Sequence, residues 1–197
     1  MFNKWADHYT EKAKAKGYKA RSVFKLQEIH ERFKIFKNGD RVLDLGCYPG
    51  SWTQFALEQV GEKGRVFGID LKFPGGIRDP RFQFYKVDVL GLTPDVIIDV
   101  MGKMDVVLSD LAPSTTGIHV VDCVRSMELC TKAFLLASEV LNLGGHFVFK
   151  VFDSEEVGPF QRQLKSYFHT VRALRPKATR RHSREVYTIC LGFKKLT

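Results

Sequence analysis

The chain has 197 residues, 44% of them hydrophobic, and a formal net charge of +9. This length is enough for a domain with a substantial core. No apolar run approaches the roughly 20 residues of a membrane span, and the first residues lack the apolar core of a secretory signal, so we expect a cytoplasmic protein that does not enter a membrane. The cysteines show no C-x-x-C pair and no zinc-type spacing with histidine, which predicts reduced thiols and no metal site: Cys47, Cys123, Cys130 and Cys190.

The positive charge is concentrated at the two ends of the chain. Residues 1–41 carry 11 basic and 5 acidic side chains, residues 42–156 carry 10 and 16, and residues 157–197 carry 10 and 1. This distribution suits a polyanionic partner, and nucleic acid is the most plausible one. The alternative is a solvated basic face that binds nothing specific.

Two helices are predicted at the start of the chain. Small and charged residues alternate over 6–16, which indicates a short solvent-facing helix. A second helix runs from Ser22, a favourable N-cap, to about Phe33. Lys25 lies off the apolar stripe of this helix and, taken alone, is a surface lysine. We describe residues 1–37 as a basic helical extension packed on the main domain.

A strand, a tight turn and a helix follow, and the rest of the chain can be placed relative to them. Apolar residues over 42–45 predict a short buried strand, and Gly46 and Gly50 mark the turn before a helix that begins at Ser51. Ligands of open parallel sheets bind beyond the carboxyl ends of the strands, so Asp44 stands where it could accept hydrogen bonds from a cofactor. The alternative is that the glycines only shape a turn.

Three further strands are each predicted to end at a carboxylate: 65–70 at Asp70, 82–87 at Asp88 and 104–110 at Asp110. Asp70 follows the glycine turn by about 20 residues, where nucleoside sites place an acid for ribose hydroxyls. A helix opened by Thr93 and Pro94 precedes the third of these strands. A long helix with core-type spacing follows Pro113 and runs to about Leu141.

The last part of the chain begins with an aromatic strand over 146–152 that contains Lys150. Burying an ammonium among phenylalanines costs free energy unless the group is paired or used, whereas a lysine that reaches solvent from an edge strand needs no such role. A helix over 155–168 and strands near 170–174 and 186–193 complete a regular β–α alternation. That alternation is typical of a doubly wound α/β sheet.

Several short pieces of the sequence carry a resemblance when taken together: Arg21-Ser22-Val23-Phe24-Lys25-Leu26, Asp44-Leu45-Gly46 with Pro49-Gly50-Ser51-Trp52, Ser109-Asp110-Leu111-Ala112-Pro113, Phe149-Lys150-Val151-Phe152 and Arg184-Glu185-Val186-Tyr187. In this order and spacing they resemble the FtsJ-type (RrmJ/RlmE-like) RNA 2′-O-ribose methyltransferases, over nearly the whole chain. The resemblance implies a Rossmann-like methyltransferase fold in a single domain over residues 1–197. Its doubly wound sheet would have seven mostly parallel strands and an antiparallel last strand.

The resemblance also implies a site. A catalytic tetrad falls on Lys25, Asp110, Lys150 and Glu185. The cofactor would be S-adenosyl-L-methionine, bound at Asp44, Gly46, Pro49, Gly50, Trp52, Asp70, Asp88 and Asp110. One departure from the family pattern is Cys47-Tyr48, which stands where relatives usually have small residues and bears on the shape of the methionine end of the pocket.

Methyl transfer to a ribose gives these residue types a role. The hydroxyl is a weak acid that must lie in line with the sulfonium methyl and lose its proton. A lysine, whose ordinary pKa is about 10.4, acts as a base only if desolvation or nearby cations lower that value. Lys150 is the best candidate for this role, with Lys25 and Asp110 orienting it and Glu185 supporting the network.

The resemblance also implies the partner, which is RNA, either large-subunit rRNA or the assembled large ribosomal subunit, with a uridine in the aminoacyl-tRNA-binding loop as the target. We expect the enzyme to act as a monomer. The alternatives are a methyltransferase of the tRNA anticodon loop and a non-catalytic RNA-binding protein on the same fold. A nicotinamide dehydrogenase would share Asp70 and the early turn. However, Gly46 and Gly50 do not form G-x-G-x-x-G, and Lys150 and Glu185 would have no role there.

Overall fold

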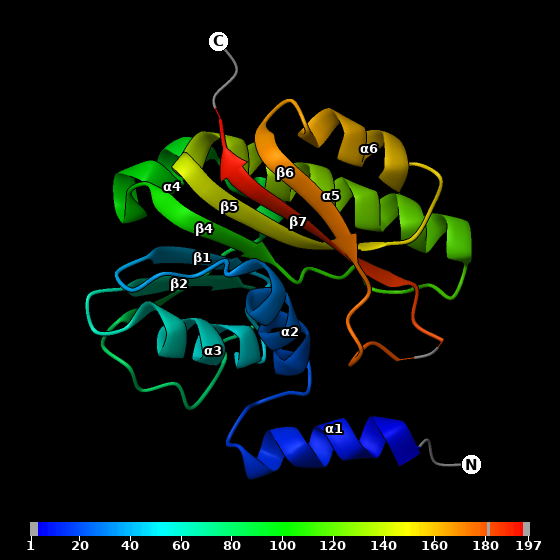
Figure 1. Ribbon diagram of the computed structural model, residues 1–197, viewed down its shortest axis with the longest axis horizontal. Helices are drawn as coiled ribbons and strands as arrows, with labels where there is room; N and C mark the ends of the chain where they lie inside the picture. The colour runs from blue at the N-terminus through cyan, green and yellow to red at the C-terminus, as the bar shows by residue number, and fades with distance from the viewer. Residues whose placement is uncertain (1–3, 181, 195–197) are drawn as a thin grey trace.

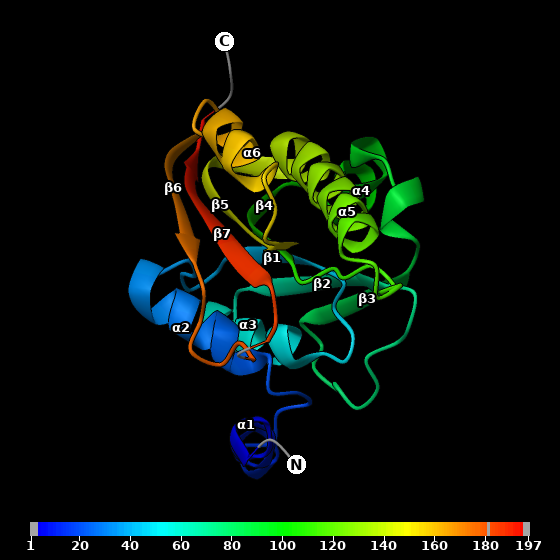
Figure 2. The same cartoon turned by 90° about the vertical axis from the view of Figure 1, so that its right-hand side faces the viewer.

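The computed structural model describes residues 4–180 and 182–194, which form one sheet with helices on both faces (Figure 1, Figure 2). The strands are β1 Arg41–Leu45, β2 Arg65–Asp70, β3 Phe82–Lys86, β4 Met104–Ser109, β5 Leu141–Phe152, β6 Phe168–Leu174 and β7 Glu185–Phe193. The helices are α1 Lys4–Ala15, α2 Val23–Phe33, α3 Ser51–Val60, α4 Pro94–Met101, α5 His119–Val140 and α6 Val157–Leu164, with a 3₁₀ turn, η1, over Val89–Gly91.

The sheet has seven strands in the order β3-β2-β1-β4-β5-β7-β6. The pairs from β3 to β5 are parallel, and β7 runs antiparallel to both β5 and β6. The predicted mostly parallel sheet with an antiparallel last strand is therefore confirmed. Because the strand order reverses next to β1 and β4, the carboxyl ends of these two strands flank the crevice in which such folds bind ligands.

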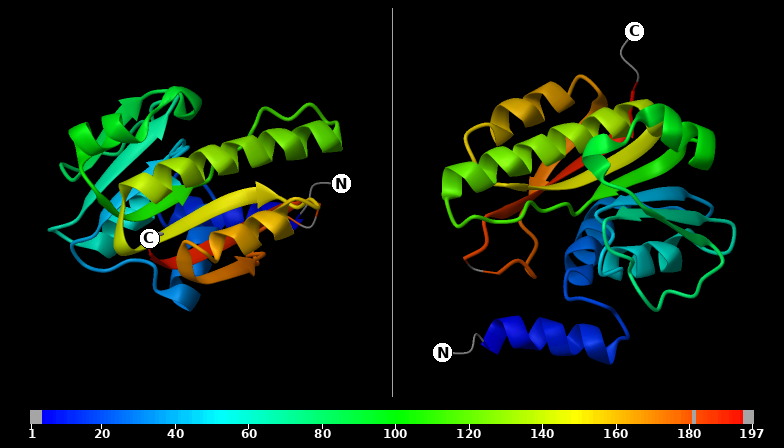
Figure 3. Two further views of the ribbon diagram at one scale, coloured as in Figure 1. Left: turned by 90° about the horizontal axis from the view of Figure 1, so that it is seen from above. Right: turned by 180° about the vertical axis from the view of Figure 1, so that it is seen from behind.

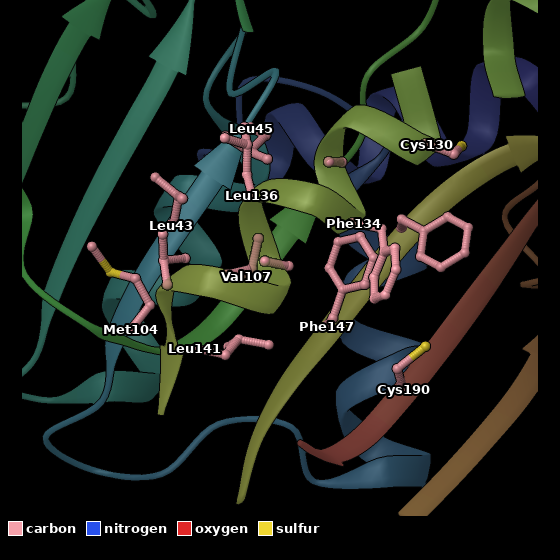
Figure 4. Packing of buried hydrophobic residues seen from close by; sticks show 14 of the residues in the cluster. Leu43, Leu45, Met104, Val107, Cys130, Phe134, Leu136, Leu141, Phe147 and Cys190 are labelled. Carbon is pink, nitrogen blue, oxygen red and sulfur yellow. The ribbon is translucent and has the colours of Figure 1, made fainter. Parts of the chain in front are cut away.

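Alternating side chains along each strand divide the core between the two faces of the sheet. Leu43, Val107 and Phe147 pack against α4, α5 and α6, and Figure 4 shows this cluster. Val42 and Val148 point to the opposite face, toward α2 and α3. Seen from above, α5 and α6 lie over the half of the sheet that contains β5 and β6 (Figure 3).

Helix α1 departs from the prediction of a solvent-facing helix. Ala13 is buried, and the ring of Tyr9 lies 5.5 Å from that of Phe24 on α2. Lys12 Nζ also lies 5.2 Å from the centre of the Phe24 ring. One face of α1 is thus packed on α2. The sequence pattern did not predict this contact, because it is narrow and made by a single alanine and an aromatic ring.

Two element boundaries also differ from the sequence-based prediction. Helix α5 begins at His119 rather than just after Pro113, because the Asp122 carboxylate accepts hydrogen bonds from the backbone N–H groups of Thr116 and Gly117 and holds the preceding residues as a loop. Strand β5 begins at Leu141, before the predicted start, and its pairing with β4 shifts register between Met104 and Val106. The ladder therefore continues past Gly144 and Gly145 instead of starting after them.

In the described part of the chain, no helix is both long and apolar enough to cross a membrane. The four cysteines are buried free thiols.

Candidate functional site

The sheet brings three polar side chains into one row on its α2 face. Ser109 at the end of β4 pairs with Phe149, so Asp110 comes next to Lys150, and Lys150 pairs directly with Tyr187 on β7. Strand alternation gives Lys150 and Tyr187 the same face as the buried Val148 and Ile189. The row crosses three adjacent strands at the crevice edge of the sheet.

The predicted tetrad residues form two ion pairs, one within this row and one beside it. Lys150 Nζ lies 3.0 Å from Asp110 Oδ1 and donates to the Asp110 backbone carbonyl at 2.8 Å. Lys25 Nζ lies 2.5 Å from Glu185 Oε2. Both lysines are buried, with 5% exposure for Lys150 and 8% for Lys25. The structure thus brings all four residues together, and burial makes the loss of either partner of a pair costly.

Lys25 is not the surface lysine that its position off the apolar stripe suggested. Helix α2 is held against α3 by a hydrogen bond between the Ser22 and Ser51 hydroxyls and by one from Trp52 Nε1 to the Ser22 carbonyl. These contacts turn Lys25 toward Glu185 across the sheet edge. The Ser22 hydroxyl does not cap its own helix, because it is engaged by Ser51.

Tyr187 is a further functional candidate. It belongs to one of the sequence motifs, but no role was predicted for it. Its hydroxyl donates to Asp110 Oδ1 at 2.9 Å and accepts from Lys25 Nζ at 3.1 Å, so it joins the two ion pairs. Burial and the neighbouring Asp110 carboxylate raise the pKa of Tyr187 well above its ordinary value. A signal was available in the sequence, since Tyr187 follows Glu185 by two residues on a strand and must share its face.

An acid-lined cavity of about 400 Å³ lies on one side of this row, at the carboxyl ends of β1, β2 and β4. Four of the predicted cofactor positions line it: Gly46, Asp70, Asp88 and Asp110. The Asp70 carboxylate accepts hydrogen bonds from the backbone N–H groups of Tyr48 and Lys72, and Asp88 accepts one from that of Leu90. These bonds fix the carboxylates at the rim and leave each with further acceptor capacity.

The two turn glycines are required by the backbone. Gly46 has φ 77° and Gly50 has φ 108°, both in the left-handed region. A Cβ on Gly46 would lie 2.8 Å from Leu111 Cδ2, and one on Gly50 would lie 2.7 Å from Ile77 Cδ1. A side chain at either position would therefore strain the backbone and require Leu111 or Ile77 to move.

Asp44 lies behind the turn and is fully buried. Its Oδ2 accepts a hydrogen bond from Thr53 Oγ1 at 2.7 Å, while Oδ1 has no partner among the described residues. Burial raises the pKa of Asp44 to about 7, and the Asp110 and Asp70 carboxylates add to the effect. A buried acceptor without a donor is costly, which suits a site that is completed by a cationic ligand.

The remaining predicted cofactor positions lie outside the cavity lining. Trp52 is buried beneath the row. Its ring centroid lies 5.8 Å from that of Tyr187, and its Nε1 donates to the Ser22 carbonyl. Pro49 belongs to the turn and does not line the cavity. At the departure from the family pattern, Cys47 is buried whereas Tyr48 lines the cavity and is half exposed, with Lys72 Nζ 5.7 Å from its ring centre.

A basic cavity of about 430 Å³ opens on the other side of the row, lined by Arg21, Ser22, Lys25, Arg180, His182, Ser183 and Glu185. It forms where the loop between β6 and β7 packs on α2. Arg21 donates to the Ala178 carbonyl at 2.6 Å, and the Lys177 backbone N–H donates to Glu28 Oε2 at 2.7 Å. The two basic ends of the sequence thus meet beside Lys25 and Glu185.

No group of three or more His, Cys, Asp or Glu side chains in the described parts of the chain is arranged to hold a metal ion.

The arrangement agrees with comparisons to known proteins. Residues 18–193 match the model of the FtsJ-like methyltransferase family. "Ribosomal RNA large subunit methyltransferase E" of Desulfatibacillum aliphaticivorans is 46% identical over 187 residues, covering 95% of this chain and 90% of that protein. The protein of the same name from Bdellovibrio bacteriovorus is 44% identical over 191 residues, with 95% and 97% covered.

A crystal structure described as a ribosomal RNA methyltransferase of Plasmodium falciparum superposes with a TM-score of 0.78 at 28% identity, over 89% of this chain and 98% of that one. The family model and these relatives each span most of the chain. The chain therefore belongs to the FtsJ-like methyltransferase family.

Proposed function

We propose that this protein transfers a methyl group from S-adenosyl-L-methionine to a ribose 2′-hydroxyl of RNA, and that its substrate is large-subunit ribosomal RNA. One observation carries the proposal. The row of Asp110, Lys150 and Tyr187, with Lys25 bonded to Tyr187, lies between an acid-lined cavity and a basic one. A cationic methyl donor and an anionic acceptor can therefore approach the same side chains from opposite sides.

The charge of the acid-lined cavity fits S-adenosylmethionine, which carries a sulfonium and an ammonium group. Asp44 Oδ1, buried without a partner among the described residues, is an acceptor that the ammonium would satisfy. Asp70 at the end of β2 would accept from the cofactor's ribose hydroxyls, as acids at this position do in nucleoside sites. Gly46, which lines the cavity, would let the backbone come close to the ligand. Asp88 lines the rim near η1 and would contact the adenosine end.

The cofactor supplies an electrophilic methyl group, and the tetrad prepares the hydroxyl that receives it. The 2′-oxygen would take the methyl group as the sulfonium S–C bond breaks. The proton of the hydroxyl would pass to Lys150 after the Lys150 ammonium has released one of its own protons to solvent. Asp110 holds the Lys150 Nζ in place through its side chain and its backbone carbonyl. Lys25 would stabilise the negative charge that develops on the oxygen, and Glu185 fixes the direction of Lys25. Much of the acceleration then comes from alignment of the hydroxyl with the methyl group.

The RNA would lie across the basic cavity and the exposed basic side chains beside it. Arg175, Lys177 and Arg180 of the loop between β6 and β7 are exposed next to α2. Cations of this kind bind phosphates and fix the register of the strand, while a single unpaired nucleotide enters the site. The names of the bacterial relatives point to large-subunit rRNA as the source of that nucleotide.

Transfer of labelled methyl from S-adenosylmethionine to RNA tests the proposal. The protein is incubated with deproteinised large-subunit rRNA, with assembled large subunits and with tRNA, each taken from cells that lack the gene. We expect label in large-subunit rRNA, in a dinucleotide that resists alkali because its 2′-oxygen is blocked. Label confined to tRNA would support the anticodon-loop alternative. RNA binding without any transfer would support the non-catalytic one.

A further inference from the structure

In the described part of the chain, no hydrogen bond joins the side chains of one ion pair of the site directly to those of the other. Lys25 pairs with Glu185, and Lys150 pairs with Asp110. Among the residues that the structure describes, the hydrogen bonds that link the two pairs pass through one atom, the hydroxyl oxygen of Tyr187, which lies 3.1 Å from Lys25 Nζ and 2.9 Å from Asp110 Oδ1. We propose that Tyr187 is a positioning residue for methyl transfer, whose hydroxyl couples the Lys25–Glu185 pair to the Asp110–Lys150 pair.

The direction of the hydrogen bonds in this link is fixed. A phenol has one proton, and Asp110 Oδ1 can only accept, so the Tyr187 hydroxyl donates to Asp110 and accepts from Lys25. Because burial keeps the phenol protonated, this direction holds throughout the working pH range. Asp110 Oδ1 is therefore held from two sides, by Tyr187 and by Lys150.

The surroundings of the ring hold the hydroxyl in place. Tyr187 has no exposed surface, its ring packs against Trp52, and Lys25 Nζ lies 5.4 Å from the ring centre. A tyrosine that served packing alone would need no hydroxyl at this depth, because a buried hydroxyl is costly unless it is bonded. The geometry therefore indicates that the hydroxyl links the two ion pairs and that the packed ring holds the hydroxyl in position.

The inference rests on the proposed function, and Tyr187→Phe tests it, since phenylalanine keeps the ring and removes only the hydroxyl. With RNA and cofactor saturating, we expect the single-turnover rate constant to fall by about tenfold to a hundredfold, the range for loss of a hydrogen bond to a charged group. Cofactor affinity should stay near that of the wild type, and the variant should remain folded at the assay temperature despite the loss of buried hydrogen bonds. The effect should appear in kcat and not in KM for RNA.

Tyr18→Phe is the matched control. The Tyr18 hydroxyl also donates to a carboxylate, Glu58, at 2.7 Å and accepts from a side chain, Gln27, at 3.2 Å, but it lies outside the row. This variant should react at the wild-type rate. The Lys25→Met substitution completes the test in a double-mutant cycle. Because Lys25 also acts on the substrate oxygen directly, its loss should still slow the Tyr187→Phe variant, but by a smaller factor than it slows the Tyr18→Phe variant.

A folded Tyr187→Phe protein at the wild-type rate would overturn the inference, as would additive effects of Tyr187→Phe and Lys25→Met. If Tyr187→Phe does not fold, 3-fluorotyrosine at position 187 keeps the hydroxyl and reports on it. Its ¹⁹F resonance should then shift in both the Lys25→Met and Asp110→Asn backgrounds, and a resonance that moves in neither would also overturn the link. The failures are distinguishable, because a wild-type protein that methylates no RNA contradicts the proposed function itself.

Discussion

Cofactor binding should depend on pH through Asp44. This carboxyl is fully buried, and Oδ1 has no partner among the described residues. Burial raises its pKa to about 7, so near neutrality an appreciable fraction of the cofactor-free protein carries a protonated Asp44. The ammonium of S-adenosylmethionine should bind the ionised form, because only that form offers a negative charge. Affinity should therefore fall as the pH falls below 7.

The size of the effect follows from that pKa. If only the ionised form binds, the apparent Kd rises by the factor 1 + 10^(pKa − pH), which is about 2 at pH 7.0 and about 30 at pH 5.5. The affinity should thus fall about 15-fold over this range, or by about 1.6 kcal/mol. The α-amino group of the cofactor stays mainly protonated in the same window, since such groups titrate at about 7.7–8.0.

The stability of the cofactor-free protein should show the opposite dependence on pH, as far as Asp44 contributes to it. Its pKa is raised by folding, so the folded state binds the proton more tightly than the unfolded state between about pH 4 and pH 7. The contribution of Asp44 to the free energy of unfolding is therefore largest below pH 4 and is lost as the pH rises through 7. Binding of the cofactor should release protons, which calorimetry in buffers of different ionisation enthalpy measures directly.

Calorimetric titration of the wild type and Asp44→Asn between pH 5.5 and 7.0 is the assay. The amide keeps a bond to Thr53 but cannot ionise, so the variant should bind weakly with little pH dependence. Asp40→Asn is the control, because burial also raises the pKa of Asp40, which precedes β1 at the opposite edge of the sheet. It should keep the wild-type pH dependence. A wild-type affinity that is flat over this range, or an equal slope in Asp44→Asn, would refute the role of Asp44.

Two further predictions concern the two cavities. Asp70→Ala should weaken cofactor binding by about tenfold or more, because it removes an acceptor at the ribose end, and unchanged affinity in a folded variant would rule out that contact. Binding of RNA should weaken with salt, with a slope of about −0.7 to −0.9 per phosphate contact. The slope should flatten when charges are reversed in the C-terminal basic segment, at Arg172, Arg175, Lys177 and Arg180. Reversal of the exposed Lys63 and Arg65, which lie at the start of β2 at the far edge of the sheet, is the control. An equal loss in both sets would indicate a non-specific charge effect.

The sequence was sufficient where local patterns decide the structure. Short apolar runs that end at Asp70 and Asp110 predicted β2 and β4, and the structure confirms both strands. The glycine turn and helix α3 also follow from local chemistry, since glycine is the residue that most readily adopts the positive φ found at Gly46 and Gly50. The assignment to the FtsJ-like family, made from scattered motifs, is confirmed by the match over residues 18–193.

The local sequence pattern did not predict contacts between residues that are far apart in the chain. The burial of Lys25 depends on α2 packing against α3 and on Glu185, which is 160 positions away. The meeting of the two basic ends depends on one bond from Arg21 to the Ala178 carbonyl and one from Lys177 to Glu28. The family resemblance implied that Trp52 binds the cofactor, yet its ring packs under Tyr187. Only the three-dimensional arrangement separates these roles.

The rate of methyl transfer by Lys150 variants is the most direct test of the catalytic account. Lys150 is 5% exposed and bonded to Asp110 through both side chain and backbone. In single-turnover reactions with RNA and cofactor saturating, Lys150→Ala should abolish transfer while leaving both affinities nearly intact, because the contribution of this residue belongs to the transition state. Lys150→Arg should fail as well, since a guanidinium keeps the charge but does not give up its proton and is longer and planar. A Lys150→Arg protein that transfers methyl at the wild-type rate would contradict the account.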